Sequence, residues 1–179
     1  IELQDYEDLA KLVDYDAIKK FRDNALNPHS NSVTRGGAEN DDIYFQAREA
    51  QNKHLANVGV VAEDYFKKIS KLTGRKYSFF EEYKMEDAEY VIVCMNSTAG
   101  TAKYTADRLR EKGIKAGVLK VRVFRPFPAE EIAKALSHVK AVAVLDKSDS
   151  LNAAGGALFE DVTSAMYVND VKVPMVNYV

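Results

Sequence analysis

The chain has few of the side chains that metal centres and disulfides require. Its 179 residues include one cysteine and three histidines. One thiol cannot hold an iron–sulfur cluster or a structural zinc ion, and it cannot form a disulfide within the chain. We expect Cys94, inside the apolar segment 90–95, to be a small buried strand residue. Because His29, His54 and His138 show no ligand spacing, we set metal and thiol chemistry aside.

Long apolar segments and an excess of one charge are also missing. No apolar stretch approaches the roughly 20 residues of a membrane-spanning helix. The formal net charge of −2 favours neither nucleic acid nor an anionic membrane surface as a partner. The first residues are acidic and lack the basic and apolar regions of a signal peptide. The start at Ile rather than Met predicts a cut or processed fragment.

The composition is that of a globular protein, with 46% apolar and 29% charged residues. Residues 1–42 predict two helices, at 6–13 and 16–26, followed by a polar linker or binding loop. Asp16 is a plausible N-cap of the second helix. We expect this part to be the end of a preceding domain, and residues 43–179 to form an α/β domain that is truncated at its C-terminus.

A long helical pattern runs from about residue 43 to Thr73, with Asp41 and Asp42 as candidate caps. Gly74 supplies the expected C-terminal stop. The segment 57–61 contains Gly and β-branched residues, which are weak helix formers, so the helix can break in two there.

After Lys84, strand and helix patterns alternate. Strands are predicted at 89–95, 115–123, 141–145 and 174–179, and helices at 98–112, 129–136 and 153–167. This order implies a three-layer α/β/α fold with a mostly parallel sheet and right-handed crossovers. An apolar sheet face left bare at the last strand would be covered by more polypeptide or by a partner.

Three places at the carboxyl ends of the strands are candidate sites, since ligands of open α/β sheets bind at that edge. In the turn 96–101, Ser97 and Thr98 either cap the following helix or help to cradle a phosphate or carboxylate. Asp146 could bind a metal, act as a base, cap a helix or form an ion pair. Arg122 and Arg125 could clamp an anion together, but a strand-end pair beside Pro-Phe-Pro more often fixes a neighbouring loop or subunit.

Arg35, in the segment Arg-Gly-Gly, is a cationic loop residue suited to close packing against another chain. No catalytic set is visible, because no histidine is placed to meet a strand-end serine.

Five segments together, in this order, resemble the pyruvate:ferredoxin oxidoreductases: 35–50 (RGGAENDDIYFQAREA), 72–77 (LTGRKY), 87–101 (DAEYVIVCMNSTAGT), 109–128 (LREKGIKAGVLKVRVFRPFP) and 143–148 (AVLDKS). The matching region looks like the second domain of the α part of these enzymes, which has the fold of the transketolase C-terminal domain. The resemblance covers nearly the whole chain.

The resemblance implies an enzyme that oxidatively decarboxylates a 2-oxoacid such as pyruvate to acetyl-CoA and reduces ferredoxin or flavodoxin. Its cofactors would be thiamine diphosphate, Mg and [4Fe-4S] clusters, with coenzyme A as cosubstrate, all held by other domains. This chain would then be a cytoplasmic, structural piece, inactive alone, with the remaining domains or subunits as partners in a dimeric assembly. Arg35, Arg122 and Arg125 are its candidate interface residues.

The chain departs from the family pattern in three places. The family usually has Gly where this chain has Asn96, and Arg where it has Lys147. The family also continues with a Gly-rich segment beyond the last strand, where this chain ends. The alternative hypothesis is a free-standing α/β module that binds a small anion at the turn 96–101 and Asp146.

Overall fold

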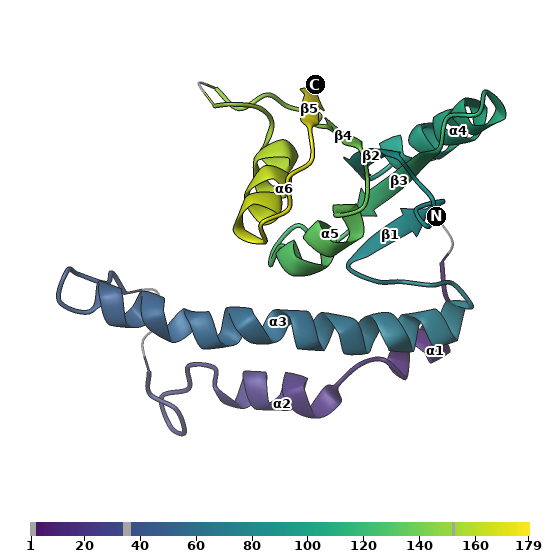
Figure 1. Ribbon diagram of the computed structural model, residues 1–179. Helices are drawn as coiled ribbons and strands as arrows, with labels where there is room; N and C mark the ends of the chain where they lie inside the picture. Colours follow the sequence, from purple (N-terminus) through teal and green to yellow (C-terminus); the bar gives the residue numbers. More distant parts are fainter. Residues whose placement is uncertain (1–2, 34–36, 152) are drawn as a thin grey trace. The chain divides into compact units, whose positions relative to one another are not determined.

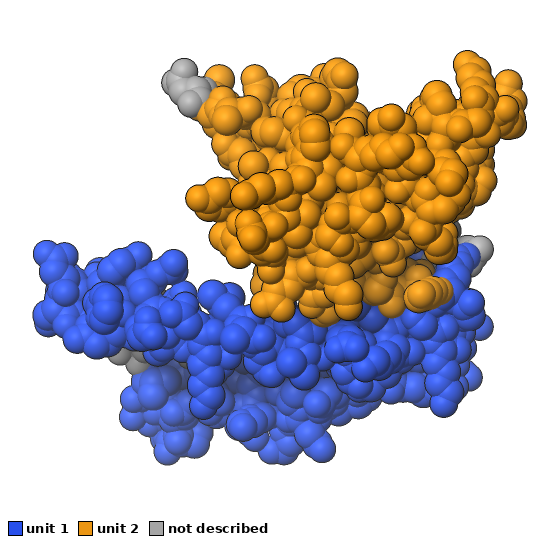
Figure 2. Space-filling view, viewed as in Figure 1, with its two compact units in different colours: residues 1–75 blue, residues 76–179 orange. Residues whose placement is uncertain are grey.

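The computed structural model describes residues 3–33, 37–151 and 153–179. Internal contacts divide the chain into two units, Ile1–Arg75 and Lys76–Val179, which Figure 2 shows in two colours. The sequence predicts a domain boundary after residue 42, between the end of a preceding domain and the α/β domain. That boundary stays a prediction.

The first unit is helical, with α1 at Tyr6–Ala10, α2 at Tyr15–Asp23 and α3 at Tyr44–Thr73. Asp14, not Asp16, is the N-cap of α2, since its carboxylate accepts a hydrogen bond from the N–H of Ala17 at 2.8 Å. Asp16 lies two residues further along, inside the first turn of the helix.

α3 is one unbroken helix of 30 residues, so the break suggested at 57–61 does not occur. Unfavourable propensities of up to about 1 kcal/mol per residue, the largest at Gly59, do not interrupt this long helix by themselves. Ile43 occupies the N-cap position without a side-chain hydrogen bond, so neither Asp41 nor Asp42 caps the helix. Gly74 ends it in the left-handed conformation, with φ of 68°, as predicted.

The second unit is built on a five-stranded sheet in the order β1-β3-β2-β4-β5. Its strands are β1 Phe80–Tyr83, β2 Tyr90–Met95, β3 Ala116–Val121, β4 Ala141–Leu145 and β5 Met175–Tyr178. β2, β3, β4 and β5 pair in parallel, and β1 pairs with β3 in the antiparallel direction. The mostly parallel sheet is confirmed, and β1 is an addition that the sequence patterns did not predict.

Helices lie on both faces of the sheet. The helix α4 (Thr98–Glu111) lies on one side, and α5 (Ala129–Leu136) and α6 (Ala157–Val168) lie on the other (Figure 1). The predicted three layers are therefore confirmed. α6 begins four residues later than expected, because Gly156 is its N-cap and has an extended backbone, with ψ of 164°.

Two apolar clusters form the core, one on each face. Against α5 and α6, the sheet buries side chains such as Val93, Leu119 and Val144. Against α4, the cluster is made of small residues, among them Cys94 and Ala106, which are both 0% exposed. The prediction of a buried structural cysteine is confirmed.

Candidate functional site at the carboxyl edge of the sheet

A cavity of about 430 Å³ lies where the strands β2 and β4 end. β3 lies on one side of β2 in the sheet, and β4 lies on the other side. The strand order therefore reverses between β2 and β4. Ligands of open α/β sheets bind at such points. The cavity is lined by Met95, Asn96, Ser97, Thr98, Phe124, Leu145, Asp146, Lys147, Ser148, Ala157 and Leu158.

Asp146 uses its carboxylate to cap α6. Its Oδ1 accepts a hydrogen bond from the N–H of Leu158 at 2.8 Å, and its Oδ2 accepts one from the N–H of Phe159 at 3.1 Å. The side-chain amide of Asn177 donates a third, to Oδ2 at 2.9 Å. A negative charge beside the first N–H groups of a helix is favourable. Of the roles weighed for Asp146, the geometry matches the helix cap.

Asn177 links this cap to the sheet. Its Oδ1 accepts a hydrogen bond from the N–H of Gly156 at 2.9 Å, and its Nδ2 also donates to the carbonyl of Val144 at 3.2 Å. A Cβ atom on Gly155 would lie 2.8 Å from that Oδ1. Sequence reasoning identified Gly155 and Gly156 as the entry to a helix but missed Asn177. The only sequence feature that could have pointed to Asn177 is that it is a lone amide in a short apolar strand.

The start of α4, at the other wall of the cavity, has no comparable cap. Ser97 occupies the N-cap position, but its side chain makes no capping hydrogen bond. Asn96 precedes it with φ of 54°, a left-handed conformation that asparagine tolerates better than most residues. Asn96 therefore fills a backbone position that also suits glycine, and Ser97 and Thr98 both face the cavity as lining residues.

The two arginines at the end of β3 bind different elements. Arg122 donates from Nη1 to the carbonyl of Ser78 at 2.7 Å and from Nη2 to Glu81 at 3.3 Å. Its guanidinium carbon also lies 5.3 Å from the centre of the Tyr77 ring. These contacts hold the segment around β1 against the end of β3.

Arg125 holds α6 instead. Its Nη1 donates to the carboxylate of Asp161 at 2.8 Å and to the carbonyl of Phe124 at 2.7 Å. Its guanidinium carbon lies 4.1 Å from the centre of the Phe124 ring. Neither Arg122 nor Arg125 lines the cavity, so the structure does not bring them together as an anion clamp. Arg35 lies outside the described residues.

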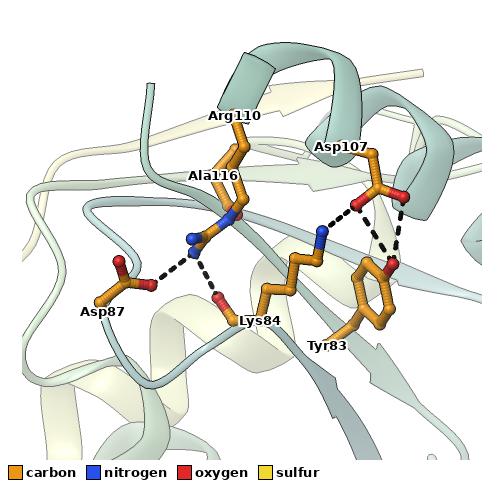
Figure 3. A network of polar contacts seen from close by, with 6 residues as sticks. All are labelled: Tyr83, Lys84, Asp87, Asp107, Arg110 and Ala116. Atoms are coloured by element: carbon orange, nitrogen blue, oxygen red, sulfur yellow. Dashed lines mark hydrogen bonds and ion pairs between the residues drawn. The ribbon is translucent and has the colours of Figure 1, made fainter. Parts of the chain in front are cut away.

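A polar network that the sequence did not predict joins β1 to α4 (Figure 3). Asp107 accepts hydrogen bonds from the Tyr83 hydroxyl at 3.1 Å and from Lys84 at 2.5 Å. Arg110 donates to the carbonyl of Lys84 at 2.8 Å and to Asp87 at 2.7 Å. The hydrogen bond from Lys84 lowers the pKa of Asp107, and that from Arg110 lowers the pKa of Asp87.

These networks are structural, and no metal-binding set accompanies them. In residues 3–33, 37–151 and 153–179, no group of three histidine, cysteine, aspartate or glutamate side chains could hold a metal ion. Over the same ranges, no helix combines the length and the apolarity that crossing a bilayer requires.

Residues 88–179 match the family model "Pyruvate:ferredoxin oxidoreductase core domain II". The chain is 47% identical over 168 residues to the pyruvate:ferredoxin oxidoreductase of Moorella thermoacetica, covering 93% of this chain and 14% of that protein. It is 44% identical over 171 residues to a pyruvate-flavodoxin oxidoreductase of Enterobacter agglomerans, covering 95% and 14%. The chain thus spans about a seventh of the length of these relatives.

Two further similarities complete the comparison. Pyruvate synthase subunit PorA of Thermotoga maritima is 44% identical over 135 residues, which are 75% of this chain and 34% of that subunit. A solved structure of 2-oxoglutarate:ferredoxin oxidoreductase from Magnetococcus marinus aligns with a TM-score of 0.43 and 21% identity, over 68% of this chain and 20% of that one.

Proposed function

Because the chain belongs to the pyruvate:ferredoxin oxidoreductase family, we propose that it serves as the core domain II segment of an enzyme that converts pyruvate to acetyl-CoA. The electrons would pass to ferredoxin or flavodoxin, the acceptors that the names of the relatives give. The proposal rests on a match that covers more than nine-tenths of this chain. The whole enzyme would work in the cytoplasm.

Within that enzyme, the role proposed for this chain is structural. The observation that carries this role is the Asp146 carboxylate, whose two oxygens already accept three hydrogen bonds from Leu158, Phe159 and Asn177. A carboxylate so engaged holds α6 on the sheet and is not a free base at the cavity. Arg122 and Arg125 likewise donate hydrogen bonds to side chains of β1 and α6.

The cofactors of the whole enzyme do not fit the residues of this chain. A [4Fe-4S] cluster takes four cysteine ligands, and this chain has one cysteine, which is fully buried. In the described residues, no group of three histidine, cysteine, aspartate or glutamate side chains could hold a metal ion, so they offer no all-protein ligand set for Mg. Thiamine diphosphate, Mg and the clusters are therefore assigned to other domains or subunits, in an assembly that we propose is dimeric.

The alternative is an anion-binding module that works without partners. The open cavity beside the uncapped start of α4 favours it. The charge of Asp146 on the cavity wall opposes it, because an anion would be bound next to a carboxylate.

Two measurements test the proposal together. The chain would be recovered from its source cells by antibody pull-down, and the polypeptides that come with it, or that contain it, would be identified by mass. We expect thiamine diphosphate and iron–sulfur clusters in that material, and pyruvate-dependent reduction of ferredoxin or flavodoxin.

Calorimetric titration of the chain alone should show no binding of thiamine diphosphate or coenzyme A tighter than the millimolar range. A lone 20.0 kDa protein with a tight anionic ligand would contradict the proposal.

A further inference from the structure

Three cations gather at the carboxyl end of β3, on the side of the sheet that α4 covers. Lys120 of β3 lies opposite Glu81 of β1 in the sheet. Because Val118 joins the apolar cluster under α4, the alternate residue Lys120 faces the same side. Lys103 of α4 and Arg122, just beyond the end of β3, both form ion pairs with the Glu81 carboxylate. We call Lys103, Lys120 and Arg122 the cation cluster.

The cation cluster holds more positive charge than its carboxylate can balance. Lys103 pairs with one oxygen of Glu81, and the Nη2 of Arg122 lies 3.3 Å from the other oxygen. In the described part of the chain, Lys120 forms no hydrogen bond or ion pair. Asp107, one turn further along α4, is paired with a different lysine. Three cations and one carboxylate therefore leave a formal charge of +2.

The three cations are partly buried, so solvent does not simply cancel their charge. The side chains of Lys103 and Arg122 are 28% and 23% exposed, and Lys120 is half-buried. Salt screens exposed charges well but screens partly buried ones much less. The hydrogen bond from Lys103, followed by the charges of all three cations, lowers the pKa of Glu81. Their positive field thus converges on one place.

The positions of the cations are set before any ligand arrives. The Lys103 ammonium group lies 5.3 Å from the centre of the Tyr83 ring. The guanidinium carbon of Arg122 lies 5.3 Å from the centre of the Tyr77 ring. The backbone of Lys120 is held on both sides, because β3 pairs with β1 and β2. Groups that are already fixed lose less conformational freedom when they bind.

We propose that the cation cluster binds a phosphate group. A phosphate monoester carries about −1.5 to −2 charges at neutral pH, which matches the charge of the cluster. Its oxygens accept hydrogen bonds from both ammonium and guanidinium groups. The phosphate can be a free anion or part of a small ligand, because the cluster recognises the same oxygens in both.

This site is separate from the cavity between β2 and β4, which none of the three cations lines. It goes beyond the reaction proposed above and does not depend on it. Because the Glu81 carboxylate repels an anion, we expect weak binding, with a dissociation constant on the order of 1 mM.

Lysine footprinting tests the proposal in the whole polypeptide that contains residues 1–179. Amines would be acetylated briefly with acetic anhydride, and mass spectrometry would give the rate for each lysine. The probes are inorganic phosphate and glycerol 3-phosphate at about ten times the expected dissociation constant. Chloride at matched ionic strength is the reference. Lys112, exposed at the C-terminal end of α4, is the control lysine.

Phosphate should slow the acetylation of Lys103 and Lys120 about tenfold, since only the unoccupied fraction reacts, and leave Lys112 unchanged. Protection by glycerol 3-phosphate, alone or together with inorganic phosphate, would assign the site to the phosphate of a small ligand. Protection by inorganic phosphate only would assign it to the free anion. Equal rates in phosphate and in chloride would overturn the proposal.

Two variants separate phosphate binding from a purely structural role of the cluster. Lys120→Gln removes a cation that has no bonded partner in the described residues, so the fold should persist while the protection of Lys103 is lost. Glu81→Gln removes the competing carboxylate and should strengthen the protection of Lys120. Circular dichroism would confirm that each variant is folded. Unchanged protection of Lys103 in folded Lys120→Gln, or weaker protection of Lys120 in folded Glu81→Gln, would count decisively against the site.

Discussion

Gly156 and Asp146 lie so close that a Cβ atom on the glycine would overlap the aspartate side chain and sit 2.6 Å from its Oδ2. The glycine is therefore required by the contact that caps α6. The end of β4 and the start of α6 form one structural unit at the cavity.

Gly156→Ala should destabilise the chain by about 1–3 kcal/mol, because the added methyl group collides with the Asp146 carboxyl group. The matched control is Gly100→Ala in α4, where a Cβ atom meets nothing within 4 Å. There we expect a gain of roughly 0.5–1 kcal/mol from helix propensity. Urea unfolding of the two variants measures the difference. The same sign for both substitutions would contradict the packing at Gly156.

Asp146→Ala should lower the free energy of unfolding by about 1–3 kcal/mol, because it leaves the N–H groups of Leu158 and Phe159 without their acceptor. Asp149→Ala is the control, since Asp149 is an exposed carboxylate on the same loop. Hydrogen exchange should speed up most in the first turn of α6. An unchanged exchange rate there would count against the cap.

Arg122→Ala should loosen β1, because the guanidinium group donates to Ser78 and Glu81 from a side chain that is only 23% exposed. We expect a loss of about 1–3 kcal/mol, as for other hydrogen bonds to a charged group. Hydrogen exchange over residues 77–83 measures it. The control is Arg108→Ala, whose exposed pair with Glu111 should be worth less than about 1 kcal/mol. Equal effects of both substitutions would refute the special role of Arg122.

Glu81 should contribute to the acid sensitivity of the chain. The hydrogen bond from Lys103 lowers the pKa of Glu81 below its ordinary value of about 4.5. A lowered pKa in the folded state means that the stabilisation is complete above about pH 4.5 and is lost as the pH falls toward the folded-state value. Glu81→Gln should flatten the fall in stability in this range, whereas Glu82→Gln on the exposed side of β1 should not. Melting temperatures between pH 7 and pH 3 test this, and parallel curves for wild type and Glu81→Gln would contradict it.

Cys94 should report global unfolding. Burial raises the pKa of its thiol, and the side chain is 0% exposed. A thiol reagent should therefore modify Cys94 in urea and leave it intact in buffer. Rapid modification of the native chain would show that the α4 side of the core opens locally.

The sequence alone was enough for the fold class and the parallel strands, because periodicity and turn residues are local signals. The strand at 141–145 and the helix at 129–136 were predicted with the bounds that the structure gives them. The family followed from ordered motifs spread along nearly the whole chain, and the comparisons confirm it.

The structural roles of the strand-end residues could not be predicted, because they depend on contacts between segments that are far apart in the sequence. Asp146 meets Asn177 across 31 positions, and Arg122 meets Ser78 across 44. Spacing in the sequence does not encode such pairs, so metal binding, a base, a cap and an ion pair were all left open for Asp146 until the sheet brought its partners together. The strand β1 was missed for the same reason, since four residues containing two glutamates become a strand only by pairing with β3. Local patterns thus determined most of the helices and strands, and tertiary packing decided the strand β1 and which polar groups are left for function.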